Sequence, residues 1–224
     1  MVPSPGSRTA AAAAPAMNVN VLLLHRAAKP LLFVAALVPL ATLLYGAFAD
    51  TLGANPAEAL IRATGDWTLR FLCLTLAVTP LRQWTGWHAL ARLRRLLGLY
   101  TFCYGVLHFL CFAWLDMGFA LDAIVRDIAK RPFILVGTAA LLSMLPLAAT
   151  SFNRAIKALG AQRWQRLHRL VYATAGLAIL HFFWMRAGKN DFAEVAVYAG
   201  VLSVLLGWRL WRRLSARAQR ATTA

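Results

Sequence analysis

Six long apolar blocks dominate this 224-residue chain and decide what it can fold into. With 60% hydrophobic and only 14% charged residues, the chain has too little polar surface for a soluble domain. Most of the blocks approach the roughly 20 residues that a helix needs to cross a bilayer. The blocks are residues 31–49, 67–81, 96–115, 132–150, 170–185 and 193–210. The sequence therefore predicts an all-α integral membrane bundle of six transmembrane helices.

The distribution of charge predicts the orientation of this bundle. All eight acidic residues fall in alternate loops or, for Glu194, at the edge of one, whereas the segments between those loops and the two termini hold 17 of the 24 Lys and Arg residues. Cytoplasmic loops of membrane proteins are rich in Lys and Arg, so both termini are expected in the cytoplasm. The net charge of +16 is then explained by contact with anionic membrane lipid rather than with nucleic acid.

The composition along the chain predicts a single membrane domain with two tails. Residues 1–20 read as a disordered or variable tail, and Met17 offers an alternative start. Residues 21–212 form the predicted six-helix domain, and residues 213–224 form a basic cytoplasmic tail. The connections between the blocks are too short for a further domain with its own core.

Three histidines lie in or beside the apolar blocks, where an ionisable side chain marks a candidate functional site. His108 lies about 18 Å along its helix from the cytoplasmic end, and His181 lies about 20 Å beyond His168 on a helix that runs in the same direction. His108 and His181 thus share a depth in the outer half of the membrane. Two imidazoles at one depth can bind both faces of one porphyrin iron. The chain has no C-x-x-C-H motif, which leaves a non-covalent b-type haem.

Other features weigh on this hypothesis. A lone intramembrane histidine is as readily explained by a hydrogen bond between helices. A step of 13 residues leaves His181 about 140° from His168 around the helix, so the two do not share a strict face. Gly105 and Gly176 would let a flat macrocycle approach the backbone, although both are ordinary residues of membrane helices. The three cysteines lie within apolar blocks, and no disulfide is predicted.

The second, cytoplasmic level is less complete. His168 sits where an inner haem would lie, but the corresponding positions before His108 are Arg94 and Arg95. Either one haem is bound, or an inner haem has an unusual ligand set. The two arginines would alternatively hold haem propionates or another anionic group, which a guanidinium matches well.

Four stretches of the sequence carry a resemblance to a known family. They are residues 94–100 (RRLLGLY) leading to His108, residues 131–133 (RPF), residues 150–151 (TS), and residues 159–172 (LGAQRWQRLHRLVY) leading to His181. In order and spacing they resemble the MsrQ (YedZ) family, the haem-binding membrane subunits of bacterial protein-methionine-sulfoxide reductase systems, within the ferric-reductase-like transmembrane group. The resemblance covers about residues 20–212.

The resemblance implies a six-helix protein of the bacterial inner membrane with b-type haem and FMN as cofactors. Its ligand histidines would be His108, His168 and His181. Such a subunit would take electrons from the quinone pool and pass them to a periplasmic molybdopterin subunit, MsrP, which reduces methionine sulfoxide in oxidised proteins. No stretch of this chain resembles a flavin-binding motif, so FMN rests on the resemblance alone.

Two other function classes remain open. A small transporter or proton-coupled channel would use the same histidines as relay groups, but Glu194, at the edge of the last block, is the one Asp or Glu within an apolar block, and carboxylates are common in such relays. A colourless anchoring subunit would not need the histidines. If the electron-transfer hypothesis holds, a periplasmic partner would dock on the outer loops 50–66, 116–131 and 186–192.

Overall fold

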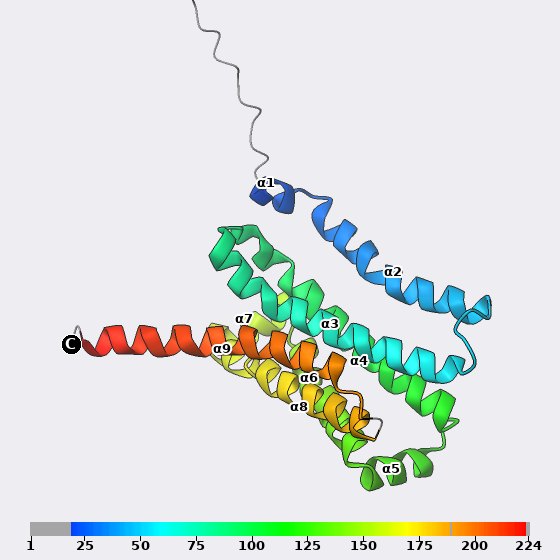
Figure 1. Ribbon diagram of the computed structural model, residues 1–224. Coiled ribbons are helices and arrows are strands. Elements are labelled where there is room, and N and C mark those ends of the chain that lie inside the picture. Colours follow the sequence, from blue (N-terminus) through cyan, green and yellow to red (C-terminus); the bar gives the residue numbers. More distant parts are fainter. Residues whose placement is uncertain (1–18, 189, 223–224) are drawn as a thin grey trace, which may run out of the picture.

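The computed structural model describes residues 19–188 and 190–222, and every regular element in that part of the chain is helical (Figure 1). The predicted all-α fold is thus confirmed. The elements are α1 (Val19–Leu24), α2 (Ala28–Phe48), α3 (Pro56–Thr85), η1 (His88–Arg92), α4 (Arg94–Cys111), η2 (Phe112–Asp116), α5 (Leu121–Lys130), α6 (Pro132–Ala149), α7 (Asn153–Leu167), α8 (Leu170–Ala187) and α9 (Ala193–Thr222). The predicted tail lies outside the described residues as far as residue 18, including Met17, while its last two residues belong to α1.

Five helices are long and apolar enough to cross a membrane, where six spans were predicted. They are α2, α4 together with η2, α6, α8 and most of α9. The remaining predicted block, residues 67–81, lies within α3; Arg70 falls inside this block, and Arg62, Asp66 and Arg82 lie beside it. Because these charges shorten its apolar part, α3 does not qualify by composition alone, and the count of six spans stays a prediction.

Helix α3 lies at the centre of the packing and has two buried faces. Its residues Leu69, Leu72 and Leu76 pack with side chains of α8 and α9. Phe71 and Val78, on another face, pack with side chains of α2 and α4. The most extensive packing between helices is that of α3 with α4 and of α6 with α8. The core therefore contains two antiparallel helix pairs, α3/α4 and α6/α8, placed side by side (Figure 1).

Helix α2 is attached to this core through two tyrosines of α4. The hydroxyl of Tyr104 donates to the carbonyl oxygen of Ala36 at 2.9 Å and accepts from the backbone N–H of Leu40 at 3.1 Å. These two backbone groups pair with each other in an unbroken α-helix. The hydroxyl therefore lies within the backbone ladder of α2, next to Pro39, which has no N–H of its own. Tyr100 makes a single bond, to the carbonyl of Phe33 at 2.8 Å.

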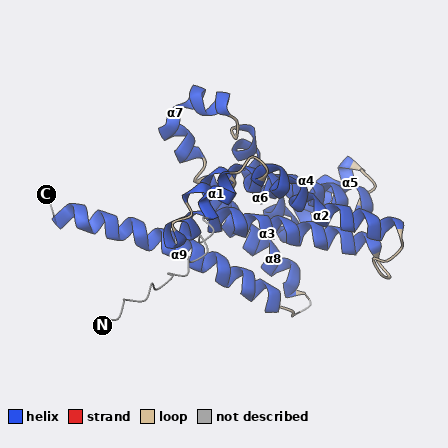
Figure 2. Ribbon diagram, turned by 90° about the horizontal axis from the view of Figure 1, so that it is seen from above, coloured by secondary structure: helices blue, strands red, loops and turns tan. Residues whose placement is uncertain are grey.

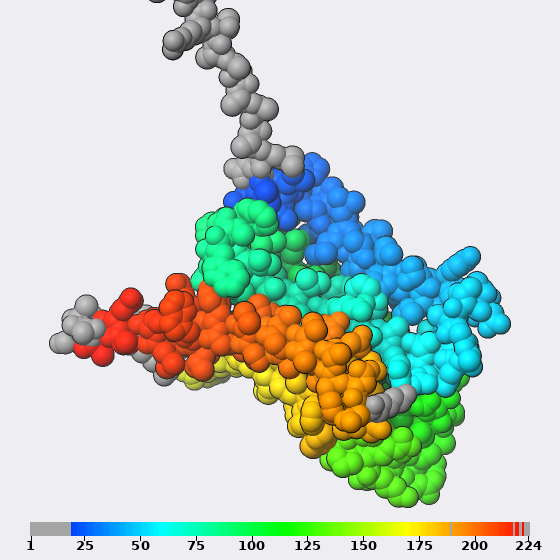
Figure 3. Space-filling model, in the orientation of Figure 1, coloured from blue at the N-terminus to red at the C-terminus, as the bar shows by residue number. Residues whose placement is uncertain are grey.

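The outer surface of the bundle is apolar, as expected where helices face lipid. On α2, for example, Leu31, Val34 and Phe48 are all exposed. Figure 3 shows α2 and α9 on the outside of the molecule, and the end of α9 projects beyond the other helices. The predicted basic tail from residue 213 therefore continues α9 as helix up to Thr222.

Two of the segments predicted as loops contain helix. Asn55 caps α3 by accepting the N–H of Glu58, and Pro56 occupies the first turn, so residues 56–66 are already helical. The segment 116–131 folds largely into α5, with Asp122 near its start and Lys130 at its end. Helix α7 connects α6 to α8 and lies at the periphery of the bundle (Figure 2).

Candidate functional site

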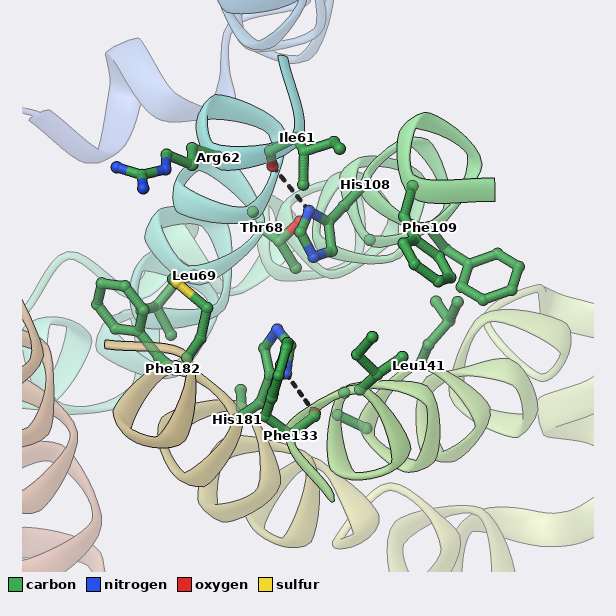
Figure 4. Close-up of a pocket in the computed structure, with 18 of the residues that line it drawn as sticks. Ile61, Arg62, Thr68, Leu69, His108, Phe109, Phe133, Leu141, His181 and Phe182 are labelled. Carbon is green, nitrogen blue, oxygen red and sulfur yellow. Dashed lines mark hydrogen bonds between the residues drawn. The ribbon is translucent and has the colours of Figure 1, made fainter. Parts of the chain in front are cut away.

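A cavity of about 570 Å³ lies between the two helix pairs and contains two of the predicted histidines. His108 of α4 and His181 of α8 lie on opposite sides of it (Figure 4). Most of its wall is apolar and includes Leu69, Leu141 and Phe182. We call this space the outer cavity, after the half of the membrane in which the sequence predicts these two histidines. Its volume falls within the range of about 300–1,000 Å³ typical of ligand sites.

The two imidazoles face each other at short range. The centroids of the His108 and His181 rings are 6.0 Å apart, and the ring planes form an angle of 74°. The structure therefore brings together the pair that helical rise placed at one depth. His168 lies in another cavity, described below.

Each of these imidazoles is held by a backbone carbonyl of the neighbouring helix. Nδ1 of His108 lies 2.8 Å from the oxygen of Ile61 on α3, and Nδ1 of His181 lies 2.6 Å from the oxygen of Phe133 on α6. A carbonyl oxygen only accepts, so each Nδ1 carries the hydrogen and each Nε2 keeps its lone pair. Within residues 19–188 and 190–222, neither Nε2 has a hydrogen-bond partner. Both Nε2 atoms are directed toward the space between the rings (Figure 4).

This donor set fits a metal ion held between two axial imidazoles. Two metal–nitrogen bonds of about 2 Å each, plus roughly 1 Å from each nitrogen to its ring centre, give a centroid separation of about 6 Å. The observed separation of 6.0 Å matches this value. Ligand histidines also characteristically donate their second ring N–H to a carbonyl or carboxylate, as both do here. The geometry thus fits a bis-histidine haem site.

One end of this cavity carries charges of both signs. Arg131 pairs with Asp127 at 2.8 Å, and Arg62 pairs with Glu58. Arg186 pairs with two acidic residues, Asp191 at 3.2 Å and Glu194 at 2.7 Å. All three arginines line the cavity. They were not among the predicted site residues.

A second cavity of about 490 Å³ lies between the helices at the other predicted level, and we call it the inner cavity. His168, Arg94 and Arg95 all line it, so the structure brings these three predicted residues together. Three further arginines line the same cavity: Arg169, Arg209 and Arg213. Among its described lining residues there is no Asp or Glu. An anionic group would balance this charge.

His168 differs from the other two histidines in its bonding. Its Nε2 is hydrogen-bonded to the hydroxyl of Thr150 at 3.0 Å, and its ring centroid lies 3.9 Å from that of Trp164. Burial lowers the pKa of His168, which keeps the ring neutral near pH 7. Arg94 and Arg95 donate to Thr79 and Asn153. Ligation by Nε2 of His168 would require the bond to Thr150 to open.

The two glycines singled out from the sequence have unequal positions. Gly105 lines the outer cavity, where an added Cβ would meet Met144 and Leu141, whereas Gly176 faces open space. Two other glycines, Gly65 and Gly137, lie against the imidazoles and were missed, because their importance depends on contacts between helices. The three cysteines are free, in agreement with the expectation of no disulfide.

Comparison with known proteins finds a matching family and several similar relatives. Residues 64–179 match the family described as "Ferric reductase like transmembrane component". The chain is 63% identical over 200 residues to the "Protein-methionine-sulfoxide reductase heme-binding subunit MsrQ" of Polaromonas naphthalenivorans, covering 89% of this chain and 91% of that protein. The protein of the same name from Ralstonia nicotianae is 56% identical, over 83% of this chain and 86% of its own length. The one from Xanthomonas oryzae pv. oryzae is 46% identical, over 87% of this chain and 90% of its own length. No solved structure matches the chain.

Proposed function

Because the chain belongs to the MsrQ family of ferric-reductase-like transmembrane proteins, we propose that it binds b-type haem and carries electrons for a protein-methionine-sulfoxide reductase. The observation that carries this proposal is the pair of imidazoles of His108 and His181, 6.0 Å apart with both Nε2 atoms free. The names of the relatives support the cofactor, and the geometry supports its position.

In this proposal the chain supplies ligands, orientation and a dry environment. Nε2 of His108 and Nε2 of His181 would ligate the iron, while the carbonyls of Ile61 and Phe133 hold the rings. Haem held in this way would supply one-electron transfer. Arg62, Arg131 and Arg186 line the same cavity and would be the guanidinium donors available to its propionates.

We also propose that α3 crosses the membrane as a sixth span and that both termini are cytoplasmic. The contrast between the cavities supports this orientation: basic side chains line the inner cavity without acids, while the outer cavity has both signs. The outer cavity would then face the periplasm of the bacterial inner membrane. Electrons would pass from the quinone pool to the haem and on to a periplasmic molybdopterin subunit, where methionine sulfoxide is reduced.

The spectrum of the purified protein tests this function. We expect a reduced-minus-oxidised difference spectrum with b-type bands and at least one haem per chain. Flavin is quantified in the same sample, because FMN stays an expectation of the resemblance alone. Colourless protein from haem-replete cells would contradict the proposal and favour the anchoring or transport alternatives.

The inner cavity is tested by changing His168. We expect His168→Ala to keep the haem of the outer cavity, because His168 lies in the other cavity. A fall of one in the ratio of haem to protein would assign a second haem to the inner cavity, with Arg94 and Arg95 beside its propionates. An unchanged ratio would assign that cavity to another anionic group. Loss of the outer haem's spectrum would contradict the separation of the two sites.

Docking of the partner is predicted on the outer loops and on α5. Asp50 and Asp122 are suitable for replacement, because neither pairs with an arginine that lines the outer cavity. We expect Asp50→Asn with Asp122→Asn to slow reduction of the partner, most clearly at low salt, and to leave the haem spectrum unchanged. Stopped-flow oxidation of the reduced haem by the partner measures this. Unchanged kinetics would place docking elsewhere.

A further inference from the structure

We propose that Gly65 and Gly137 are positioning residues for the two imidazoles of the outer cavity. Each glycine makes room for one ring to reach a backbone carbonyl, and that carbonyl fixes the hydrogen on Nδ1 and leaves Nε2 free. The inference rests on the proposed haem function. It adds two residues that would act on the haem through the ligand side chains that they touch.

The arrangement on α6 illustrates the requirement. In an α-helix the carbonyl of residue i accepts the N–H of residue i+4, so the carbonyl of Phe133 points toward Gly137. His181 donates to the same oxygen, and its ring therefore lies over the glycine. A Cβ on Gly137 would come within 2.7 Å of Nδ1 and 2.8 Å of Cε1 of His181. A side chain there and the present ring position are incompatible.

Helix α3 has the same arrangement of carbonyl, glycine and histidine, with slightly more space between the glycine and the ring. The carbonyl of Ile61 accepts from His108 and belongs to the turn that ends at Gly65. A Cβ on Gly65 would lie 3.1 Å from both Cε1 and Nδ1 of His108. The contact is tight, and the ring would have to move by a few tenths of an ångström. Alanine should therefore disturb His108 less than it disturbs His181.

The recurrence of the contact in both helix pairs argues against chance. In each pair an earlier helix provides a carbonyl and a glycine four residues later, and the following long helix provides the histidine. The histidine follows its carbonyl residue by 47 positions in α3/α4 and by 48 in α6/α8. Among the glycines of the described chain, Gly65 and Gly137 alone have a histidine ring within reach of an added Cβ.

Displacement of a ring has a defined consequence for a bound metal. The Nδ1–H···O=C bond sets the tautomer, orients Nε2 and makes the imidazole a stronger donor, and loss of such a partner typically costs about 10–100-fold in metal affinity. When the imidazole becomes a weaker donor, the oxidised iron loses more stabilisation than the reduced iron does. Loss of the bond should therefore also raise the midpoint potential.

The test compares four alanine variants of the full-length protein. Gly137→Ala and Gly65→Ala place a methyl group against an imidazole, whereas Gly176→Ala and Gly200→Ala enter open space and line neither cavity. Haem affinity is measured by titrating haem into apoprotein, and the midpoint potential by redox titration. We expect Gly137→Ala to bind haem about 10–100-fold more weakly and at a higher potential. Gly65→Ala should shift both in the same direction by less, and the two controls should match the wild type.

The outcomes separate this inference from the proposed function. Wild-type protein without haem would overturn the proposed function. Haem-loaded wild type together with Gly137→Ala and Gly65→Ala variants that equal the controls would overturn the positioning role alone. Equal losses in all four variants would also overturn it, since the effect would then not depend on contact with the ring. Should Gly137→Ala fail to fold, Gly65→Ala tests the positioning role by itself. This variant is expected to fold, because alanine is a better helix former than glycine and the added Cβ at position 65 is less crowded than at position 137.

Discussion

Alanine at both His108 and His181 should remove the b-type haem spectrum from the purified protein. The two side chains supply the only Nε2 atoms that face each other across the outer cavity in the described chain. Without them an iron porphyrin would keep only apolar contacts and its propionate contacts. Each single variant should retain haem weakly, because one axial ligand remains. Difference spectra, with haem extracted and quantified per chain, measure the loss.

Two other histidines provide the control for this prediction. His25 lies between α1 and α2, and His88 begins η1, so both are outside the outer cavity. Alanine at both of these positions should leave haem content and spectrum at the wild-type level. A protein without His108 and His181 that kept its full spectrum would refute the ligand assignment, and the glycine proposal with it.

Phenylalanine in place of Tyr104 should destabilise the protein, because the hydroxyl satisfies two backbone groups of α2. Tyr104 is only 1% exposed, and its oxygen bridges the carbonyl of Ala36 and the N–H of Leu40. A buried polar group left unpaired costs about 1–3 kcal/mol. We expect a loss of about 2 kcal/mol in the free energy of unfolding, since α2 recovers part of the loss by closing its own ladder.

Tyr100→Phe is the matched comparison, because it removes one hydrogen bond, to Phe33, from the same helix and the same aromatic cluster. Its cost should be about 1 kcal/mol. Denaturant titration in detergent micelles, followed by tryptophan fluorescence, measures both variants. Neither tyrosine lines the outer cavity, so haem content should not change. Equal stability of the two variants would show that the bridging position of the Tyr104 hydroxyl has no energetic role.

The positions of the histidines could be predicted because a helix converts sequence spacing into distance. A fixed rise per residue placed His108 and His181 at one depth, and the charge pattern gave both helices the same direction. The calculated turn of about 140° between His168 and His181 does not apply in the same way, because His168 caps α7 and precedes α8, so no single helix joins the two residues.

The groups that hold the histidines could not be predicted from this sequence. Carbonyls of Ile61 and Phe133 belong to the backbone, and any apolar residue would provide the same oxygen. Gly65 and Gly137 resemble other glycines of apolar helices until the packing of neighbouring helices is known. Helix α5 fell within a predicted loop, because its ten residues are too few and too charged to form a membrane block.

The division of the site between two helix pairs has a mechanical consequence. Each imidazole is hydrogen-bonded within its own pair, and the pairs meet at the outer cavity through apolar side chains such as Leu69 and Phe182. Apolar contacts are not directional, so sliding of one pair against the other is the softest displacement available to the site. Such sliding changes the separation of the two Nε2 atoms directly. If the proposed haem is bound there, the lateral pressure and thickness of the surrounding bilayer would become physical variables that tune the electron affinity of the site.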